Sequence, residues 1–128
     1  MSVKDIMRTE VVTASAEASI KDVAKIMSEK NIGSVLIVDE SNRVIGIFTE
    51  RDLVKVVALG IDINTPIKNV MTTNVISAYP TDNIAAIAIK MLEKGIRHMP
   101  VVDEYNRLLG IISIRDVLRA YTAGCEFP

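Results

Sequence analysis

Apolar residues recur along this chain with two different periods. Between residues 20 and 27 they follow the spacing i, i+3, i+4, i+7, which places them on one face of a helix. These residues are Ile20, Val23, Ala24 and Met27. Residues 34–38 and 44–48 are instead short apolar runs, and the polar, turn-forming segment 39–42 separates them. The first pattern predicts an amphipathic helix, and the second predicts a β-hairpin.

Two further elements complete the predicted unit. The run at 11–13 predicts a short strand before the helix, and residues 50–59 predict a helix after the hairpin, ended by Gly60. Apolar side chains at 53–59 cover a wide arc, so we expect this last helix to be buried on two sides. The order is β-α-β-β-α. Because a helix connects the first two strands, these strands should be parallel through a right-handed crossover.

The whole pattern occurs twice, at a constant offset of 64 residues. Comparison of 3–55 with 67–119 gives 20 identical pairs out of 53. This repetition predicts an α/β (α+β) fold, in which two β-α-β-β-α units pack with pseudo-two-fold symmetry and enclose paired clefts. The expected divisions are a first repeat at 1–60, a linker at 61–66, a second repeat at 67–124 and a tail at 125–128.

The second repeat should contain the same elements as the first. We expect a strand at 75–77, a helix from Ile84 to Gly95, a hairpin of 100–102 with 108–112, and a last helix at 114–123. Proline cannot donate a hydrogen bond to a sheet, so Pro100 should stand at the start of its strand. Ser19 with Asp22 is typical of a capping box for the first helix, and Asp82 or Asn83 should cap its copy.

Composition narrows the class of protein. The hydrophobic content of 49% and the mean hydropathy of +0.30 are high for 128 residues, and we expect one shared core and a subunit interface. The apolar runs are far shorter than the roughly 18 residues of a membrane span, and the N-terminus lacks a signal-peptide layout. The single cysteine, Cys125, fits a reducing cytoplasm. A net charge of −1 with interleaved signs disfavours nucleic-acid binding, and one cysteine with one histidine disfavours a metal site.

The candidate chemistry lies where each hairpin meets its last helix. Thr49 and Asp52 stand three residues apart there, and Ser113 and Asp116 are their copies. A hydroxyl with free amides at a helix start suits phosphate, and a carboxylate can accept hydrogen bonds from a ribose diol. The same spacing is also that of an ordinary helix-capping box. From the residues alone, both interpretations stand, and the two roles are compatible.

Basic residues distinguish the two copies. Arg51 and Arg115 occupy equivalent first-turn positions, whereas Arg97-His98 in the second repeat replaces Gly33-Ser34 of the first. The fold does not require this pair. Two cationic or donor side chains just before a hairpin strand suit a phosphate tail. A Ser-His-Asp triad could be drawn from Ser113 and His98, but no nucleophile elbow accompanies it. We therefore expect no catalytic residue and no enzyme.

Taken together, the motifs resemble those of a tandem cystathionine-β-synthase (CBS) domain pair, or Bateman module, standing alone. The resemblance covers about 3–122. It is carried by the lead-ins Asp5-Ile6-Met7 and Asn69-Val70-Met71, by Val-Asp-Glu in both hairpins, and by Gly-Ile-x-Thr/Ser-x-Arg-Asp at the last helices. It implies binding of AMP, ADP, ATP or S-adenosylmethionine as a ligand, without a cofactor, in clefts between the repeats.

The resemblance also assigns residues to each cleft. One cleft would combine Thr49, Arg51 and Asp52 with Val75, Ile76, Ser77, Ile96, Arg97 and His98. The other would combine Ser113, Arg115 and Asp116 with Val11, Val12, Thr13, Ile32, Gly33 and Ser34. Apolar residues would hold the base, the aspartates the ribose, and the hydroxyls and basic groups the phosphates. The charge difference predicts that phosphorylated ligands prefer the first cleft.

The expected function is that of a regulatory ligand sensor. The lone cysteine favours a cytoplasmic protein, and the resemblance implies a homodimer paired through its helices. This module would signal ligand binding to an effector protein of unknown identity. The alternative is a purely structural dimerisation or scaffold domain, in which the hydroxyl–carboxylate pairs serve only as helix caps.

Overall fold

The computed structural model describes residues 1–124, and the predicted tail lies outside them. The elements in chain order are η1 (Val3–Asp5), β1 (Thr13–Ala14), α1 (Ile20–Lys30), β2 (Ser34–Val38), β3 (Val44–Thr49), α2 (Glu50–Ala58), η2 (Ile67–Asn69), α3 (Ile84–Lys94), β4 (His98–Val102), β5 (Leu108–Ser113) and α4 (Ile114–Gly124). The mixed α+β class is as predicted. Within 1–124 no helix is both long enough and apolar enough to cross a membrane.

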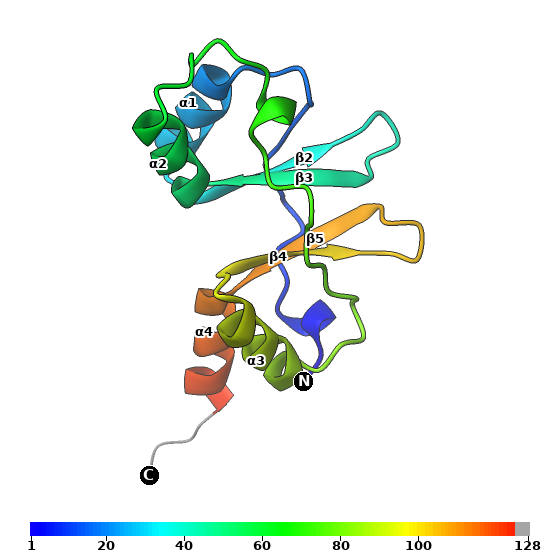
Figure 1. The fold of residues 1–128 in the computed structure, drawn as a ribbon. Coiled ribbons are helices and arrows are strands. Elements are labelled where there is room, and N and C mark those ends of the chain that lie inside the picture. The colour runs from blue at the N-terminus through cyan, green and yellow to red at the C-terminus, as the bar shows by residue number, and fades with distance from the viewer. Residues whose placement is uncertain (125–128) are drawn as a thin grey trace. The chain divides into compact units, whose positions relative to one another are not determined.

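The sheets have the predicted connectivity (Figure 1). β1 pairs with β2 in parallel, and β2 pairs with β3 as an antiparallel hairpin. β4 and β5 form the second hairpin, with a register shift before the last pair, as in the first. In place of a full strand, Ala78 alone bridges Val101 in parallel. The predicted parallel pairing of the first two strands is therefore confirmed.

Both predicted first strands were placed too early in the sequence. The first begins at Thr13 rather than at residue 11, because Thr13 opposite Leu36 is the first ladder pair with β2. Its copy, predicted at 75–77, is reduced to the bridge at Ala78. A run of β-branched residues indicates extended backbone, but it does not say which of its residues reach the neighbouring strand.

The prediction that Pro100 starts its strand was wrong. β4 begins at His98, and Pro100 lies opposite Ile111 in the middle of the hairpin. The carbonyl of Pro100 accepts a hydrogen bond from the amide of Ala78, 2.9 Å away. The nitrogen and carbonyl of a strand residue point to the same side, so the proline nitrogen faces this sparsely paired edge rather than β5. The hairpin thus loses no hydrogen bond.

Local signals predicted the helix ends correctly. The Ser19 hydroxyl caps α1 by accepting from the Asp22 amide at 3.0 Å, which is one half of the predicted capping box, and Asn83 caps α3 by accepting from the amides of Ala85 and Ala86. Gly95 ends α3 in the left-handed region, at φ 64°. These features follow from the chemistry of a few neighbouring residues, which explains why the sequence reveals them.

The last helix of the first repeat is not buried on two sides. Asp52 and Val56 of α2 are buried, whereas Val54, Val57 and Leu59 are 67%, 71% and 74% exposed. The wide apolar arc was read correctly, but the chain itself covers only part of it. The rest of this surface is open to another molecule.

The chain forms two compact units whose boundaries cut across the repeats. One unit joins Met1–Val11 to Ile76 and the residues after it, and the other is Val12–Val75. Each lead-in segment therefore packs on the body of the other repeat. Val3 belongs to a core cluster with residues of α3, β4, β5 and α4, and Ile67 to a cluster with residues of α1, β2, β3 and α2. Each exchanged lead-in thus completes a hydrophobic cluster within one unit, and the expected core shared by both repeats stays a prediction.

Each lead-in crosses the return strand of a hairpin at a glycine. Thr72 exchanges two backbone hydrogen bonds with Ile47 (3.0 and 2.9 Å), and Arg8 exchanges two with Ile111 (both 2.9 Å). A Cβ at Gly46 would overlap the Met71 side chain. A Cβ at Gly110 would lie 2.7 Å from the backbone oxygen of Arg8. The repeated glycine is thus a requirement of this crossing.

The repeated Val-Asp-Glu-x-Asn-Arg block builds the hairpin turn. Asp39 accepts hydrogen bonds from the amides of Ser41 and Arg43 (both 2.9 Å) and from the Arg43 guanidinium (3.0 Å), and Asp103 repeats the arrangement in the second hairpin. The hydrogen bond from the Arg43 amide is the largest of the causes that lower the pKa of Asp39 below its ordinary value of 3.8. The pKa of Asp103 is also lowered: desolvation raises it, but hydrogen bonds led by that from the Arg107 backbone outweigh this.

This turn predicts a pH dependence of stability. A carboxyl whose pKa is lowered by folding stabilises the fold fully above its unfolded value, here 3.8, and loses that contribution as the pH falls toward the folded value. The double variant Asp39→Asn with Asp103→Asn should therefore be less stable at pH 7 and lose less stability than wild type below about pH 4. Urea unfolding followed by circular dichroism at several pH values measures this. Glu40→Gln with Glu104→Gln removes the same charge from the same turns and should leave the wild-type slope; parallel curves for all three proteins would contradict the prediction.

Candidate functional site

The first candidate site is built on the junction between β3 and α2. Thr49 is the N-cap of α2, and its hydroxyl accepts a hydrogen bond from the Asp52 amide at 3.3 Å. Asp52 Oδ2 in turn accepts from the amide and the hydroxyl of Thr49, at 3.0 and 3.2 Å. The pair is therefore a full capping box, and Asp52 is only 9% exposed. The capping interpretation of the spacing is confirmed.

The second copy has the same geometry. Ser113, at the end of β5, donates its amide and its hydroxyl to Asp116 Oδ2, both at 2.9 Å, and accepts from the Asp116 amide at 3.2 Å. Asp116 is 6% exposed. Two nearly buried carboxylates thus stand at helix starts, where amides and the helix dipole favour negative charge. The reciprocal bonds between Ser113 and Asp116 are those of a helix cap.

A third residue in each site, which the sequence analysis did not identify, makes the two hydroxyl–carboxylate pairs different. Thr72 donates its hydroxyl to Asp52 Oδ1 at 3.2 Å, with Oδ2 at 3.4 Å. At the equivalent position, Arg8 donates Nε to Asp116 Oδ1 at 3.0 Å, and Arg119 lies 3.6 Å from the same oxygen. Positions 8 and 72 follow the shared Met7 and Met71 directly. The difference in charge between arginine at position 8 and threonine at position 72 was the sequence signal that could have revealed this contact.

The first residues of each hairpin lie beside the hydroxyl–carboxylate pair of the same repeat. Ser34 pairs with Thr49, and His98 pairs with Ser113. The carbonyls of Gly33 and Arg97 accept from the first amides of α2 and α4, at 3.1 and 2.9 Å. The structure therefore brings Ile32, Gly33 and Ser34 to the first pair and Ile96, Arg97 and His98 to the second.

The remaining predicted residues are placed unit by unit. Thr13 is in β1, while Val12 and Val75 belong to the same unit as Asp52; Val11, Ile76 and Ser77 belong to the unit of Asp116. Arg51, Arg97 and Arg115 are exposed and thus accessible to an anion. Both predicted clefts combine residues of the two units, so their assembly remains a prediction. Among residues 1–124, no cluster of three metal-ligating side chains occurs.

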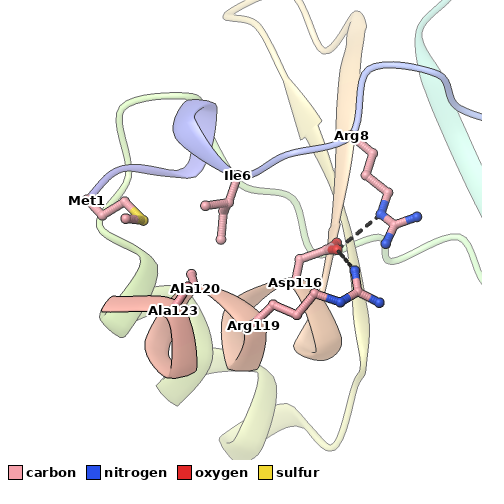
Figure 2. A pocket seen from close by; sticks show the side chains of 7 residues that line it. All are labelled: Met1, Ile6, Arg8, Asp116, Arg119, Ala120 and Ala123. Carbon is pink, nitrogen blue, oxygen red and sulfur yellow. Dashed lines mark hydrogen bonds and ion pairs between the residues drawn. The ribbon is translucent and has the colours of Figure 1, made fainter. Parts of the chain in front are cut away.

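A surface hollow lies beside the second pair (Figure 2). Its volume is about 540 Å³, in the range of small-molecule sites. Its polar edge is formed by Arg8, Asp116 and Arg119, and its apolar part by Met1, Ile6, Ala120 and Ala123. The first repeat has the larger Val56 and Leu59 where the second has Ala120 and Ala123.

Two α+β units that exchange their lead-ins, each with a capped carboxylate at its last helix, define a tandem-repeat module with paired sites. The chain belongs to the CBS domain family: the family model for the CBS domain matches residues 3–59 and 67–123.

Individual relatives agree with this assignment. A crystal structure of the CBS domain pair of protein MJ0100 in complex with 5′-methylthioadenosine and S-adenosyl-L-methionine is 36% identical, with a TM-score of 0.90 over 98% of both chains. An uncharacterized 17.7 kDa protein of Acidianus ambivalens is 39% identical over 92% of this chain and 71% of its own length. An L-aspartate semialdehyde sulfurtransferase of Methanocaldococcus jannaschii is 38% identical, but the chain spans only 23% of that protein.

Proposed function

We propose that this chain is a regulatory module that binds an adenosine-containing ligand and signals binding to a partner protein. The observation that carries the proposal is the likeness, over 98% of both chains, to a CBS pair solved with 5′-methylthioadenosine and S-adenosyl-L-methionine. The chain itself supplies two nearly buried carboxylates at helix starts, each beside hydroxyl and amide donors. Such a set matches the ribose and phosphate groups of a nucleotide.

Each type of residue has a distinct role in this proposal. Asp52 and Asp116 accept hydrogen bonds from the ribose diol, while apolar residues of the lead-ins and hairpin starts hold the base. Thr49 and Ser113, with the exposed arginines and His98, face the phosphates. The first cleft gains Arg97 and His98, and so we propose that it takes phosphorylated ligands first.

A ligand panel tests the proposal. Isothermal titration calorimetry of the purified chain with AMP, ADP, ATP, S-adenosylmethionine and 5′-methylthioadenosine should give saturable binding of at least one ligand. GMP is the matched control for the base, and 2′,3′-dideoxyadenosine 5′-monophosphate is the matched control for the diol. If the dideoxy compound binds as tightly as AMP, then ribose recognition by the aspartates is wrong.

One observation favours a second candidate function. Both hydroxyl–carboxylate pairs close full capping boxes, so their presence is accounted for without a ligand. In that case the chain is a dimerisation or scaffold domain, and Asp52→Asn lowers stability without changing any binding. Absence of heat with every ligand, from a folded protein, would support this function.

We further propose that the chain forms a homodimer through its helices. Exposed apolar side chains lie on α2 (Val54, Val57), on α3 (Ile89, Leu92) and on α4 (Leu118, Tyr121). Leaving such surface in water is unfavourable, and a second copy could cover it. Signalling would follow if ligand binding shifted the packing at this interface.

The dimer gives a prediction in mutants. Val57→Glu with Leu118→Glu should weaken self-association at least about tenfold, because an unpaired carboxylate would be buried in the interface. Sedimentation velocity over a concentration series measures the effect. Tyr79→Glu, at an exposed apolar residue outside the helices, is the matched control and should remain dimeric. A dimer that survives the double change would place the interface elsewhere.

A further inference from the structure

The two aspartates that we propose to bind ribose already accept hydrogen bonds from different donors. Asp52 is held by the neutral hydroxyl of Thr72, whereas Asp116 is held by the guanidinium of Arg8. We propose that Arg8 is a specificity-determining residue: it competes with the ribose diol for Asp116 and makes the second copy the weaker ligand site. This inference rests on the proposed function.

The acceptor atoms show why the copies are unequal. In the second copy, Asp116 Oδ2 is engaged by the amide and hydroxyl of Ser113, and Oδ1 is engaged by Arg8 and approached by Arg119 (Figure 2). In the first copy, Thr49 engages Oδ2, and the donor to Oδ1 among residues 1–124 is the Thr72 hydroxyl, which also lies 3.4 Å from Oδ2. A diol that approaches Asp116 competes for Oδ1 with a cation, whereas one that approaches Asp52 competes there with one neutral donor.

The Arg8–Asp116 contact is strong enough to compete with a ribose diol for the carboxylate. A charge-assisted hydrogen bond is roughly twice as strong as a neutral one, and Asp116 is only 6% exposed, so the pair is partly desolvated. The backbones of Arg8 and Thr72 are held alike, by two hydrogen bonds each to Ile111 and to Ile47, so the copies differ in the side chains. A threonine hydroxyl can turn away from its carboxylate by rotation about one bond, whereas release of Asp116 separates a charged pair. The Arg8 side chain is 57% exposed, so solvent screening limits the effect to about three- to tenfold in affinity.

The internal repeat supplies the matched exchange of residues. Arg8→Thr gives the second copy the donor of the first, and Thr72→Arg gives the first copy the donor of the second. The probe is 5′-methylthioadenosine, because it has a diol and no phosphate that could engage Arg8. An Asp52→Ala background isolates the second copy, and an Asp116→Ala background isolates the first. Lys4→Thr removes one positive charge from the same lead-in without touching Asp116.

Calorimetry then separates the outcomes. We expect Arg8→Thr to tighten binding to the second copy about three- to tenfold, Thr72→Arg to weaken binding to the first by a similar factor, and Lys4→Thr to change neither. If the chain binds the probe but Arg8→Thr leaves the second copy unchanged, or weakens it, this inference is overturned and the proposed function stands. If no variant and no wild-type chain binds any adenosine ligand, both are overturned. Circular dichroism confirms folding, and the reciprocal Thr72→Arg exchange decides the question if Arg8→Thr does not fold.

Discussion

Replacement of Asp52 by alanine is expected to weaken adenosine-ligand binding to the first copy at least about tenfold. Hydrogen bonds to a charged group contribute roughly 1.5–3 kcal/mol, and the diol would lose its acceptor in a nearly buried position. Isothermal titration calorimetry against the tightest ligand of the panel measures the change. Asp116→Ala should have a smaller effect, because Arg8 already competes for that carboxylate.

The control must separate binding from helix capping. Asp52 also caps α2, so its loss should lower stability by roughly 0.5–2 kcal/mol. Asn83→Ala removes the cap of α3, outside the proposed site, and should cost a similar amount while leaving affinity unchanged. If both variants lower affinity equally, the effect arises from destabilisation and not from a lost ligand contact.

Gly110→Ala is expected to lower the free energy of unfolding by about 1–3 kcal/mol, as overpacking of a close contact does. The added Cβ would lie 2.7 Å from the backbone oxygen of Arg8, and backbone held by two hydrogen bonds to Ile111 cannot move aside easily. Urea unfolding followed by circular dichroism measures the loss. The substitution should also disturb the Arg8–Asp116 ion pair, because it displaces Arg8 itself.

Gly46→Ala is the matched comparison. At this equivalent position, the Cβ would meet the flexible side chain of Met71, which can change rotamer. We therefore expect a smaller loss of stability than for Gly110→Ala. Equal losses, or a larger loss at Gly46, would contradict the view that lead-in backbone at Gly110 is the tighter contact.

The sequence predicted the elements whose causes are local. Helix caps at Ser19 and Asn83 and the stop at Gly95 depend on residues a few positions apart, and each was found in place. The exchange of lead-ins between the units was not predicted, because it depends on contacts between residues far apart in the chain. Pro100 was misplaced for a related reason: its tolerance depends on which side of β4 lacks a partner strand.

In the candidate site too, the local features were predicted from the sequence and the long-range contacts were not. The Thr-x-x-Asp and Ser-x-x-Asp spacing indicated the two carboxylates and their caps. The contacts of Thr72 with Asp52 and of Arg8 with Asp116 span 20 and 108 residues, and no local pattern encodes them. The position-by-position comparison of the two repeats includes arginine at 8 against threonine at 72, but it does not show what these side chains contact.

The most direct test of ligand sensing compares wild type with the double variant Asp52→Ala/Asp116→Ala by isothermal titration calorimetry. The titrants are AMP, S-adenosylmethionine and 5′-methylthioadenosine, and circular dichroism verifies that both proteins are folded. We expect saturable binding of at least one ligand to wild type and loss of that binding in the double variant. Undiminished affinity in the folded double variant, or no binding to folded wild type, would contradict the proposed function.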